Sequence, residues 1–298
     1  LRNGGGSVKT DILYEDNDIL VVYKPAGLGV QTAKTGQQDV VSELKNYMRQ
    51  CGKRGRCSRA AGTGVPYLGI IHRLDQPVEG LLVFAKNKKA AASLSGQLQE
   101  QANGGTLHKQ YYAVICGKPA AEEGELVDYL YKNKENMAEA AAGPEVSGAK
   151  RAVLRYRILR VCSIENLSGG EIAENVMAME TAECRPGSVW AAEGIGRPGR
   201  MRTAESGKES GSRHIALADI RIQTGRFHQI RAQMALAGTP ILGDFKYGNE
   251  ETKALSQQLR IQHVALCAYS LMFLHPCAGK EMRFQIEPRG RAFSFLHE

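Results

Sequence analysis

The chain has 298 residues, 43% of them hydrophobic and 23% charged, which is the composition of a globular protein that can bury a core. Its net charge of +8 favours a polyanionic partner such as RNA. No apolar run reaches the ~18 residues of a membrane-spanning helix, so we expect no membrane association. Residues 1–10 are polar and Gly-rich and lack the apolar core of a signal peptide. We therefore predict that residues 1–10 form a flexible segment and that residues 11–298 form one domain.

Seven cysteines are scattered along the chain without a CxxC pair. This pattern favours neither a disulfide framework nor a zinc site, and it is typical of the reducing cytoplasm. Cys267, His275 and Cys277 are of metal-ligand type but lack a second clear pair. We therefore predict that the protein binds no metal.

The apolar pattern in chain order predicts short strands and a few helices. Residues 12–24 predict a β-hairpin that turns at Asp16–Asp18. Residues 69–86 predict two buried strand segments around a polar turn. Further strands are predicted at 109–116, 151–162, 214–223 and 281–287. Helices are predicted at 39–50 after Asp39, at 87–101 after Asn87, and at 228–237 before Gly238 and Pro240. A mixed, mostly antiparallel strand pattern with peripheral helices indicates an α+β fold.

Two segments lack periodic structure. Residues 51–66 are basic and Gly-rich, with cations at Lys53, Arg54, Arg56 and Arg59. They predict either a solvated loop or one that contacts phosphates. Residues 164–212 are rich in Gly, Glu, Ala, Ser and Arg and have no sustained period. We interpret them as a mobile insertion between two strands.

Polar residues interrupt the buried run at His72, Arg73 and Asp75. In extended backbone Arg73 and Asp75 point to the same face, where the arginine would favour an ionised carboxylate. Taken alone, this pattern indicates a buried structural ion pair. A second polar group follows the Gly225 turn, where His228 and Arg231 share a helical face. It predicts either an anion site at a helix N-terminus or a simple helix cap.

Together these segments are far more specific. GIIHRLDQPVEGLLVFAK, KQYYA and TGRFHQIRAQMALAGTPILGDFKYG resemble, in order and spacing, the motifs of the RluA family of pseudouridine synthases. The resemblance spans residues 12–287 apart from the insertion. It implies a long, bent, mainly antiparallel sheet with flanking helices and a central RNA-binding cleft. Val78, Phe227 and Gln233 depart from the family pattern, which bears on the choice of substrate rather than on the reaction.

The resemblance also implies the chemistry. Such a synthase isomerises uridine within rRNA or tRNA and needs no cofactor. The resemblance implies that Asp75 is the catalytic carboxylate. It implies that Tyr111 stacks on the uracil and helps to remove a proton, and that Arg231 pairs with Asp75. Whether the carboxylate attacks covalently or acts as a base stays open.

The target uridine must flip out of the RNA to reach such a site. The resemblance implies that Arg73 fills the vacated stack. It also implies RNA contacts for the motif residues His72, Leu74, Arg226, His228 and Gln229. Tyr112, on the opposite strand face, is predicted to be a core residue.

Two other functions compete with this one. The first is a non-catalytic RNA-binding or RNA-folding protein on the same scaffold, which the intact Asp75, Tyr111 and Arg231 disfavour. The second is a glycosidase-like hydrolase, for which the matched motifs offer no obvious second carboxylate. No S4 RNA-binding domain is recognisable, and we expect a cytoplasmic monomer.

Overall fold

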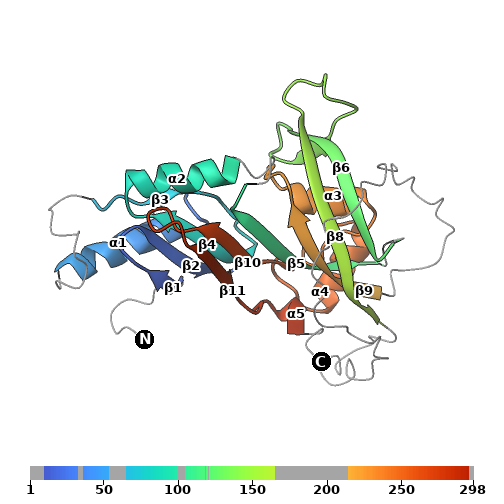
Figure 1. The fold of residues 1–298 in the computed structure, drawn as a ribbon. Helices are drawn as coiled ribbons and strands as arrows, with labels where there is room; N and C mark the ends of the chain where they lie inside the picture. Colours follow the sequence, from blue (N-terminus) through green and yellow to red (C-terminus); the bar gives the residue numbers. More distant parts are fainter. Residues whose placement is uncertain are drawn as a thin grey trace. The chain divides into compact units, whose positions relative to one another are not determined.

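The computed structural model describes residues 10–32, 36–53, 65–99, 105–117, 119, 121–164 and 214–294. The chain divides into two compact units (Figure 1). The first contains Leu1–Gln110 and Cys267–Arg289, and the second contains Tyr111–Leu266 and Gly290–Glu298. Within the described part of the chain, no helix has the length and apolar character needed to cross a membrane.

The first unit is built on a mixed sheet. Its strands are β1 (Asp11–Glu15), β2 (Ile19–Lys24), β3 (Gly69–Ile70), β4 (Glu79–Ala85), β10 (Leu266–Leu274) and β11 (Glu281–Gln285). They lie in the order β1-β2-β4-β10, with β3 beside β4 and β11 beside β10. All neighbours are antiparallel except β4 and β10. The strands predicted at 12–24 and 281–287 are confirmed. Of the two buried segments predicted within 69–86, β4 is a buried strand, whereas β3 has two residues and is half-buried. The sequence analysis missed β10.

Local chemistry sets the geometry of this sheet. The Asp16 carboxylate accepts hydrogen bonds from the amides of Asp18 and Ile19, both at 2.8 Å, which closes the β1–β2 turn. Every residue of β2 and β4 is buried, as their continuous apolar runs predict. Gly80 has a φ of 131°, and a Cβ there would lie 2.5 Å from the Ala268 amide. Glycine therefore permits the close parallel pairing of β4 with β10.

Two helices flank this sheet (Figure 1). They are α1 (Val40–Lys53) and α2 (Lys88–Gln99). Both begin at the predicted caps: the Ser42 amide donates to Asp39 Oδ1 at 2.7 Å, and the Ala90 amide donates to Asn87 Oδ1 at 2.9 Å. Helix α2 packs Ala90 and Leu94 into a core shared with β2, β4 and β10. Arg54, Arg56 and Arg59 of the predicted basic loop lie outside the described residues.

The second unit is a meander of antiparallel strands with short helices. Its strands are β5 (His108–Cys116), β6 (Glu123–Lys132), β7 (Ala138–Ala140), β8 (Lys150–Ser163) and β9 (His214–Ile222), in the order β5-β9-β8-β6-β7. The helices are α3 (Gln229–Leu236), α4 (Glu250–Gln258) and α5 (Arg291–Ser294). Strands β5, β8 and β9 and helix α3 are as predicted. The sequence analysis missed β6, β7, α4 and α5. In β6 the only buried side chains are Leu126 and Leu130, so its apolar signal is weak.

The ends of the predicted insertion are neighbours in the sheet. Strand β8 ends at Ser163 and β9 begins at His214, and these two residues pair in the antiparallel register. The excursion therefore joins two adjacent strands, as predicted. Residues 165–213 lie outside the described residues, so their mobility stays a prediction.

We expect the second unit to fold without this insertion. Replacement of residues 164–212 by a short Gly/Ser linker should preserve the fold, because the strand ends that it connects already face each other. Loop closure depends only weakly on length, by roughly 0.6 kcal/mol for each doubling. Thermal unfolding of the shortened and parent proteins measures the effect, and a melting temperature close to that of the parent is expected. A large fall would show that the segment contributes to the core.

Candidate active site

Asp75 lies in the connection between β3 and β4. Its carbonyl accepts from the Val78 amide at 3.1 Å, which closes a turn over Gln76 and Pro77. Arg73 is exposed and donates from Nη2 to Gln31 Oε1 at 2.9 Å, whereas Leu74 is buried. The exposure of Arg73 rules out the buried structural ion pair that the local pattern alone indicated. Its guanidinium lies at the surface, and its place in the RNA stack stays a prediction.

His72 supports this connection from inside. Only 6% of it is exposed, and its Nε2 accepts from the Val83 amide at 3.4 Å. The ring hydrogen is then on Nδ1, a buried atom for which the described residues offer no hydrogen-bond partner. Burial, together with the positive charge of Lys109, lowers the pKa of His72 well below its usual range. Its environment favours a neutral, supporting role, so contact with RNA stays a prediction.

The two tyrosines of KQYYA are adjacent in β5. Tyr111 is buried, with 5% of it exposed, whereas Tyr112 is half-buried. The expectation that Tyr112 is a core residue is therefore wrong, because this face of the strand is only partly covered. Lys109, at the start of the motif, is also buried, and burial lowers its pKa to about 8.

Arg231 is fixed by a carboxylate that the sequence analysis did not name. Its Nε donates to Asp244 Oδ2 at 2.7 Å and its Nη2 to Asp244 Oδ1 at 2.8 Å. The two side chains are 5% and 1% exposed. A two-point bond of this kind fixes the plane of the guanidinium. The pairing of Arg231 with Asp75 stays a prediction.

The turn that carries Asp244 explains the GDFKYG sequence. Asp244 Oδ1 also accepts from the amides of Lys246 at 3.0 Å and Tyr247 at 3.1 Å. Gly243 has a φ of 77°, and a Cβ there would lie 2.1 Å from the His263 carbonyl oxygen. Only glycine fits this position. The Gly-Asp pair of the third motif was therefore the signal that could have identified Asp244.

Tyr247 links this turn to the start of α3. Its hydroxyl accepts from the Ala138 amide at 2.6 Å and lies 2.9 Å from His228 Nδ1. His228 precedes α3 with a φ of 50°, and its ring stacks on Phe227 at 3.7 Å between centroids. Phe227 is 42% exposed, and the Lys132 ammonium lies 4.8 Å from its ring centre. This exposed aromatic and cationic edge is chemically suited to nucleic acid.

Gln229 has a structural task that the resemblance did not reveal. Its Oε1 accepts from the Arg226 amide at 2.9 Å, and its Nε2 donates to the Val153 carbonyl and to Gln233 Oε1, both at 3.0 Å. Gln233, one of the family departures, continues the chain by donating to Asp128 Oδ2 at 2.6 Å. The chain of amides fastens α3 to β6 and β8. Gln229 is 4% exposed, and its contact with RNA stays a prediction.

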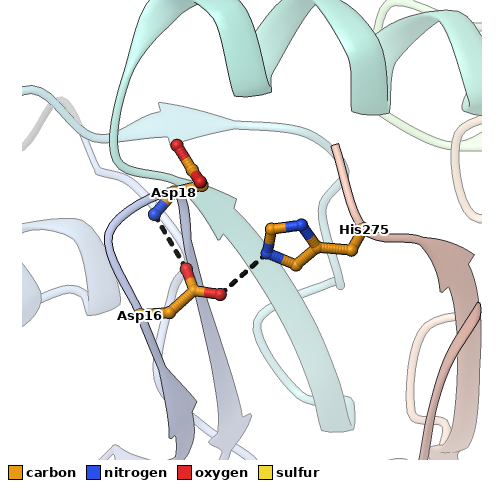
Figure 2. Close-up of side chains that lie close together, drawn as sticks. All are labelled: Asp16, Asp18 and His275. Atoms are coloured by element: carbon orange, nitrogen blue, oxygen red, sulfur yellow. Dashed lines mark hydrogen bonds and ion pairs between the residues drawn. The ribbon is translucent and has the colours of Figure 1, made fainter. Parts of the chain in front are cut away.

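A third group of polar side chains joins the β1–β2 turn to the end of β10. Figure 2 shows Asp16, Asp18 and His275, whose ligand-type atoms lie within 4.8 Å of one another. Asp16 Oδ2 receives bonds from His275 Nε2 at 2.7 Å and the Tyr14 hydroxyl at 3.0 Å. His275 Nδ1 accepts from the Ala278 amide at 3.0 Å, so the ring hydrogen lies on Nε2.

These bonds account for the cluster without a metal ion. Both oxygens of Asp16 and both nitrogens of His275 are engaged. Of the predicted ligand types, Cys267 is buried within β10 and Cys277 is exposed beyond its end. Neither belongs to the metal-type group found among the described residues. The absence of a bound metal stays a prediction.

The hydrogen bonds to Asp16 predict how the stability of the protein depends on pH. Burial raises the pKa of Asp16, but hydrogen bonds from the Ile19 and Asp18 amides, His275 and Tyr14 outweigh it and lower the pKa below 3.8. A lowered folded-state pKa gives stability that is present above the unfolded value and lost as pH falls through the folded one. We expect Asp16→Asn to reduce stability at neutral pH and to flatten its decline in acid. Urea unfolding at a series of pH values, with Asp18→Asn as control, checks this. An equally steep decline in both variants would contradict it.

Comparison with known proteins places these motifs in a family. The family model described as RNA pseudouridylate synthase matches residues 18–236. The ribosomal large subunit pseudouridine synthase D of Zymomonas mobilis is 29% identical over 96% of this chain and 71% of its own length. The chloroplastic RNA pseudouridine synthase 2 of Arabidopsis thaliana is 26% identical over 97% of this chain, which spans 64% of that protein.

Solved structures share the fold. Human RNA pseudouridylate synthase domain containing 4 aligns with a TM-score of 0.60 at 19% identity, covering 96% of this chain and 92% of that one. Human RNA pseudouridylate synthase domain containing 1 aligns with a TM-score of 0.59 at 17% identity, covering 96% of this chain and 86% of that one. The mixed, mostly antiparallel architecture is thus that of pseudouridine synthases. With the family model matched over residues 18–236, the chain belongs to the RNA pseudouridylate synthase family, as its resemblance to RluA-type members implied.

Proposed function

We propose that this protein isomerises specific uridines in structured RNA to pseudouridine. The observation that carries the proposal is the family match over residues 18–236, within which the motif residues Asp75, Tyr111 and Arg231 are all intact. The basic net charge of +8 suits an RNA partner. The buried bond between Arg231 and Asp244 supplies a rigid guanidinium, as a preorganised site requires.

The reaction needs a carboxylate and a proton carrier. The N1–C1′ bond of uridine breaks, uracil turns, C5 joins C1′, and the proton lost from C5 is balanced by one gained at N1. Positive character develops at C1′, which Asp75 stabilises by its charge or by covalent attack. Tyr111 stacks on the uracil and takes part in removing the C5 proton. Electrons are neither gained nor lost overall, so the proposal includes no cofactor.

The names of the relatives guide the choice of RNA. The protein of Zymomonas mobilis acts, by its name, on the ribosomal large subunit. We propose rRNA as the first substrate to test and tRNA as the second. We further propose that the protein acts as a monomer in the cytoplasm, where the free cysteines found among the described residues would stay reduced.

A direct assay tests this function. Purified protein is incubated with rRNA or tRNA transcripts that carry tritium at uridine C5, and release of tritium to water is followed. Release that matches pseudouridine in the digested RNA supports the proposal, and chelators should leave the rate unchanged. RNA binding without release would instead support a non-catalytic RNA-binding protein. Pseudouridine maps of RNA from cells lacking the gene then identify the position.

Substitution of the two adjacent tyrosines tests the assignment of Tyr111. Tyr111→Phe should lose most turnover but keep RNA binding, because the ring still stacks while the hydroxyl that handles the proton is gone. We expect a loss of about 100-fold or more, the usual contribution of a positioned acid or base. Tyr112→Phe, the matched control in the same strand, should be much milder. The reverse order of effects would show that Tyr112 is the reacting side chain.

A further inference from the structure

Phe227 is an aromatic side chain held at the surface of the second unit. It lies just before α3, and 42% of it is exposed, although phenylalanine is among the residues that are most often buried. The imidazole of His228 stacks on it, with 3.7 Å between the ring centres and 20° between the two planes. The ring of Phe227 is therefore oriented by a neighbour while much of it faces solvent.

A chain of contacts connects Phe227 to Arg231, which the proposed function places in the active site. The His228 ring lies edge-on to the Tyr247 ring, with 5.6 Å between the centres, and its Nδ1 lies 2.9 Å from the Tyr247 hydroxyl. The guanidinium carbon of Arg231 lies 5.1 Å from the centre of the Tyr247 ring. The exposed ring is thus separated from Arg231 by only two side chains, both of the second unit.

Strand β6 brings a cation to the same place. Leu130 of this strand lies in one core cluster with Ala232 of α3. Lys132, the last residue of β6, is two positions further on and lies on the same face of the strand. Its ammonium is 4.8 Å from the centre of the Phe227 ring. Because Lys132 is exposed, its flexible side chain can leave the ring without uncovering a buried charge.

An exposed ring with a cation beside it matches the two parts of a nucleotide. Aromatic side chains stack on any base, since every base has a π face, and lysine binds phosphate as a point charge. An exposed cation–π contact is weaker than base stacking, so a base can take the place of the ammonium at the ring. The ammonium is then available for the phosphate. Only an unpaired base can be splayed out to make this contact.

We propose that Phe227 and Lys132 form a nucleotide site beside the active site, in which Phe227 stacks on an unpaired base near the target uridine and Lys132 binds its phosphate. The proposal rests on the proposed function, because that function places Arg231 at the target uridine. It gives a substrate contact to Phe227, which departs from the family pattern, and to Lys132, which lies outside the three motifs. The preferred RNA should therefore carry an unpaired nucleotide close to the modified position.

Binding of single-stranded RNA tests this site without any enzymatic assay. The probes are a labelled oligoadenylate of about 12 nucleotides and an abasic strand of equal length, which keeps the phosphates but has no bases. Phe227→Leu keeps an apolar side chain and removes the ring. It should weaken binding of oligoadenylate by roughly 5- to 150-fold, the effect of losing one stacked base, and leave binding of the abasic strand unchanged.

Phe227→Trp restores an aromatic surface and should bind oligoadenylate at least as tightly as the wild type. The melting temperature of each variant verifies that it is folded. Equal affinity of wild type and folded Phe227→Leu for oligoadenylate would overturn the proposal. Leu236→Ala is the matched control, because Leu236 is 49% exposed at the other end of α3. This variant should bind both probes as the wild type does.

The salt dependence of binding tests the role of Lys132. Lys132→Met keeps the length of the side chain and removes its charge, so it should weaken binding of both probes. It should also reduce the slope of log affinity against log salt by about 0.7, the value for one phosphate contact on a single strand. Phe227→Leu should leave this slope unchanged. An unaltered slope in Lys132→Met would overturn the phosphate contact.

Kinetics test whether the site lies beside the target uridine. On an RNA that the wild type modifies, Phe227→Leu should raise KM far more than it lowers kcat, because the ring acts away from the reacting atoms. The unpaired nucleotides of that RNA are then made abasic one at a time. One of them, close to the modified uridine, should raise KM in the wild type but not in Phe227→Leu. Absence of any such position would overturn the proposed place of the site.

Two other outcomes have distinct meanings. An inactive wild type would refute the proposed function, whereas the oligoadenylate assay would still decide whether Phe227 and Lys132 bind RNA. An exposed ring can also join two copies of the chain. If sedimentation showed a dimer that Phe227→Leu dissociates, and the affinity for oligoadenylate stayed the same, the ring would serve self-association and the nucleotide site would be overturned.

Discussion

Asp75→Asn is expected to abolish isomerisation while leaving the fold and most RNA affinity intact. The substitution keeps the size of the side chain and removes its charge, which under the proposed function stabilises or traps the positive centre at C1′. Loss of a group that touches the reacting atoms lowers kcat by on the order of 10³-fold or more. The backbone bond that closes the turn, from the Val78 amide to the residue 75 carbonyl, does not involve the side chain and should persist.

Three measurements on one preparation test this prediction. They are tritium release from C5-labelled RNA, RNA affinity by filter binding, and the melting temperature. Glu79→Gln is the control, because it also removes a carboxylate from the first unit, but one engaged with Tyr23 and Arg289. It should keep far more activity than Asp75→Asn. Wild-type-like turnover by a clean Asp75→Asn preparation would falsify the catalytic assignment.

Local signals in the sequence predicted most of the first unit. The turn after β1 needs only the Asp16 carboxylate and the amides of Asp18 and Ile19. Helices α1 and α2 begin where Asp39 and Asn87 cap them. Each of these signals acts within three residues of the chain, so propensity and spacing suffice to find it.

The features that the sequence did not reveal depend on residues that are distant in the chain. Lys24 looks like an ordinary strand end before Pro25, and nothing local shows that its ammonium meets the carbonyl of Gln76. Leu130 of β6 is buried in a cluster with Ala138, Ala152 and Ala232, which come from other elements of the chain. Asp244 lies at the start of its own turn, but its carboxylate binds Arg231, which is thirteen positions earlier in the chain. The third motif contains Asp244, but only the fold shows which side chain its carboxylate binds.

Breaking the pair of Arg231 and Asp244 should produce the largest loss of stability among these variants. Both side chains are almost fully buried, so removing one partner leaves a buried charge without its counterion. The cost of such a change is about 3–5 kcal/mol. Arg231→Met and Asp244→Asn should each lower the free energy of unfolding of the second unit by an amount of this order. Asn at position 244 can still accept from the Lys246 and Tyr247 amides, so the turn itself should survive.

The double variant separates the structural role of Arg231 from its chemical role. Arg231→Met combined with Asp244→Asn leaves neither charge of this pair, and replacing both members of a buried pair costs far less than breaking it. Stability should therefore recover well above that of either single variant, which a double-mutant cycle of urea unfolding quantifies. Activity should not recover, because the guanidinium assigned to the active site is still missing. If turnover returned together with stability, Arg231 would be a structural residue only, and its proposed role beside Asp75 would be refuted.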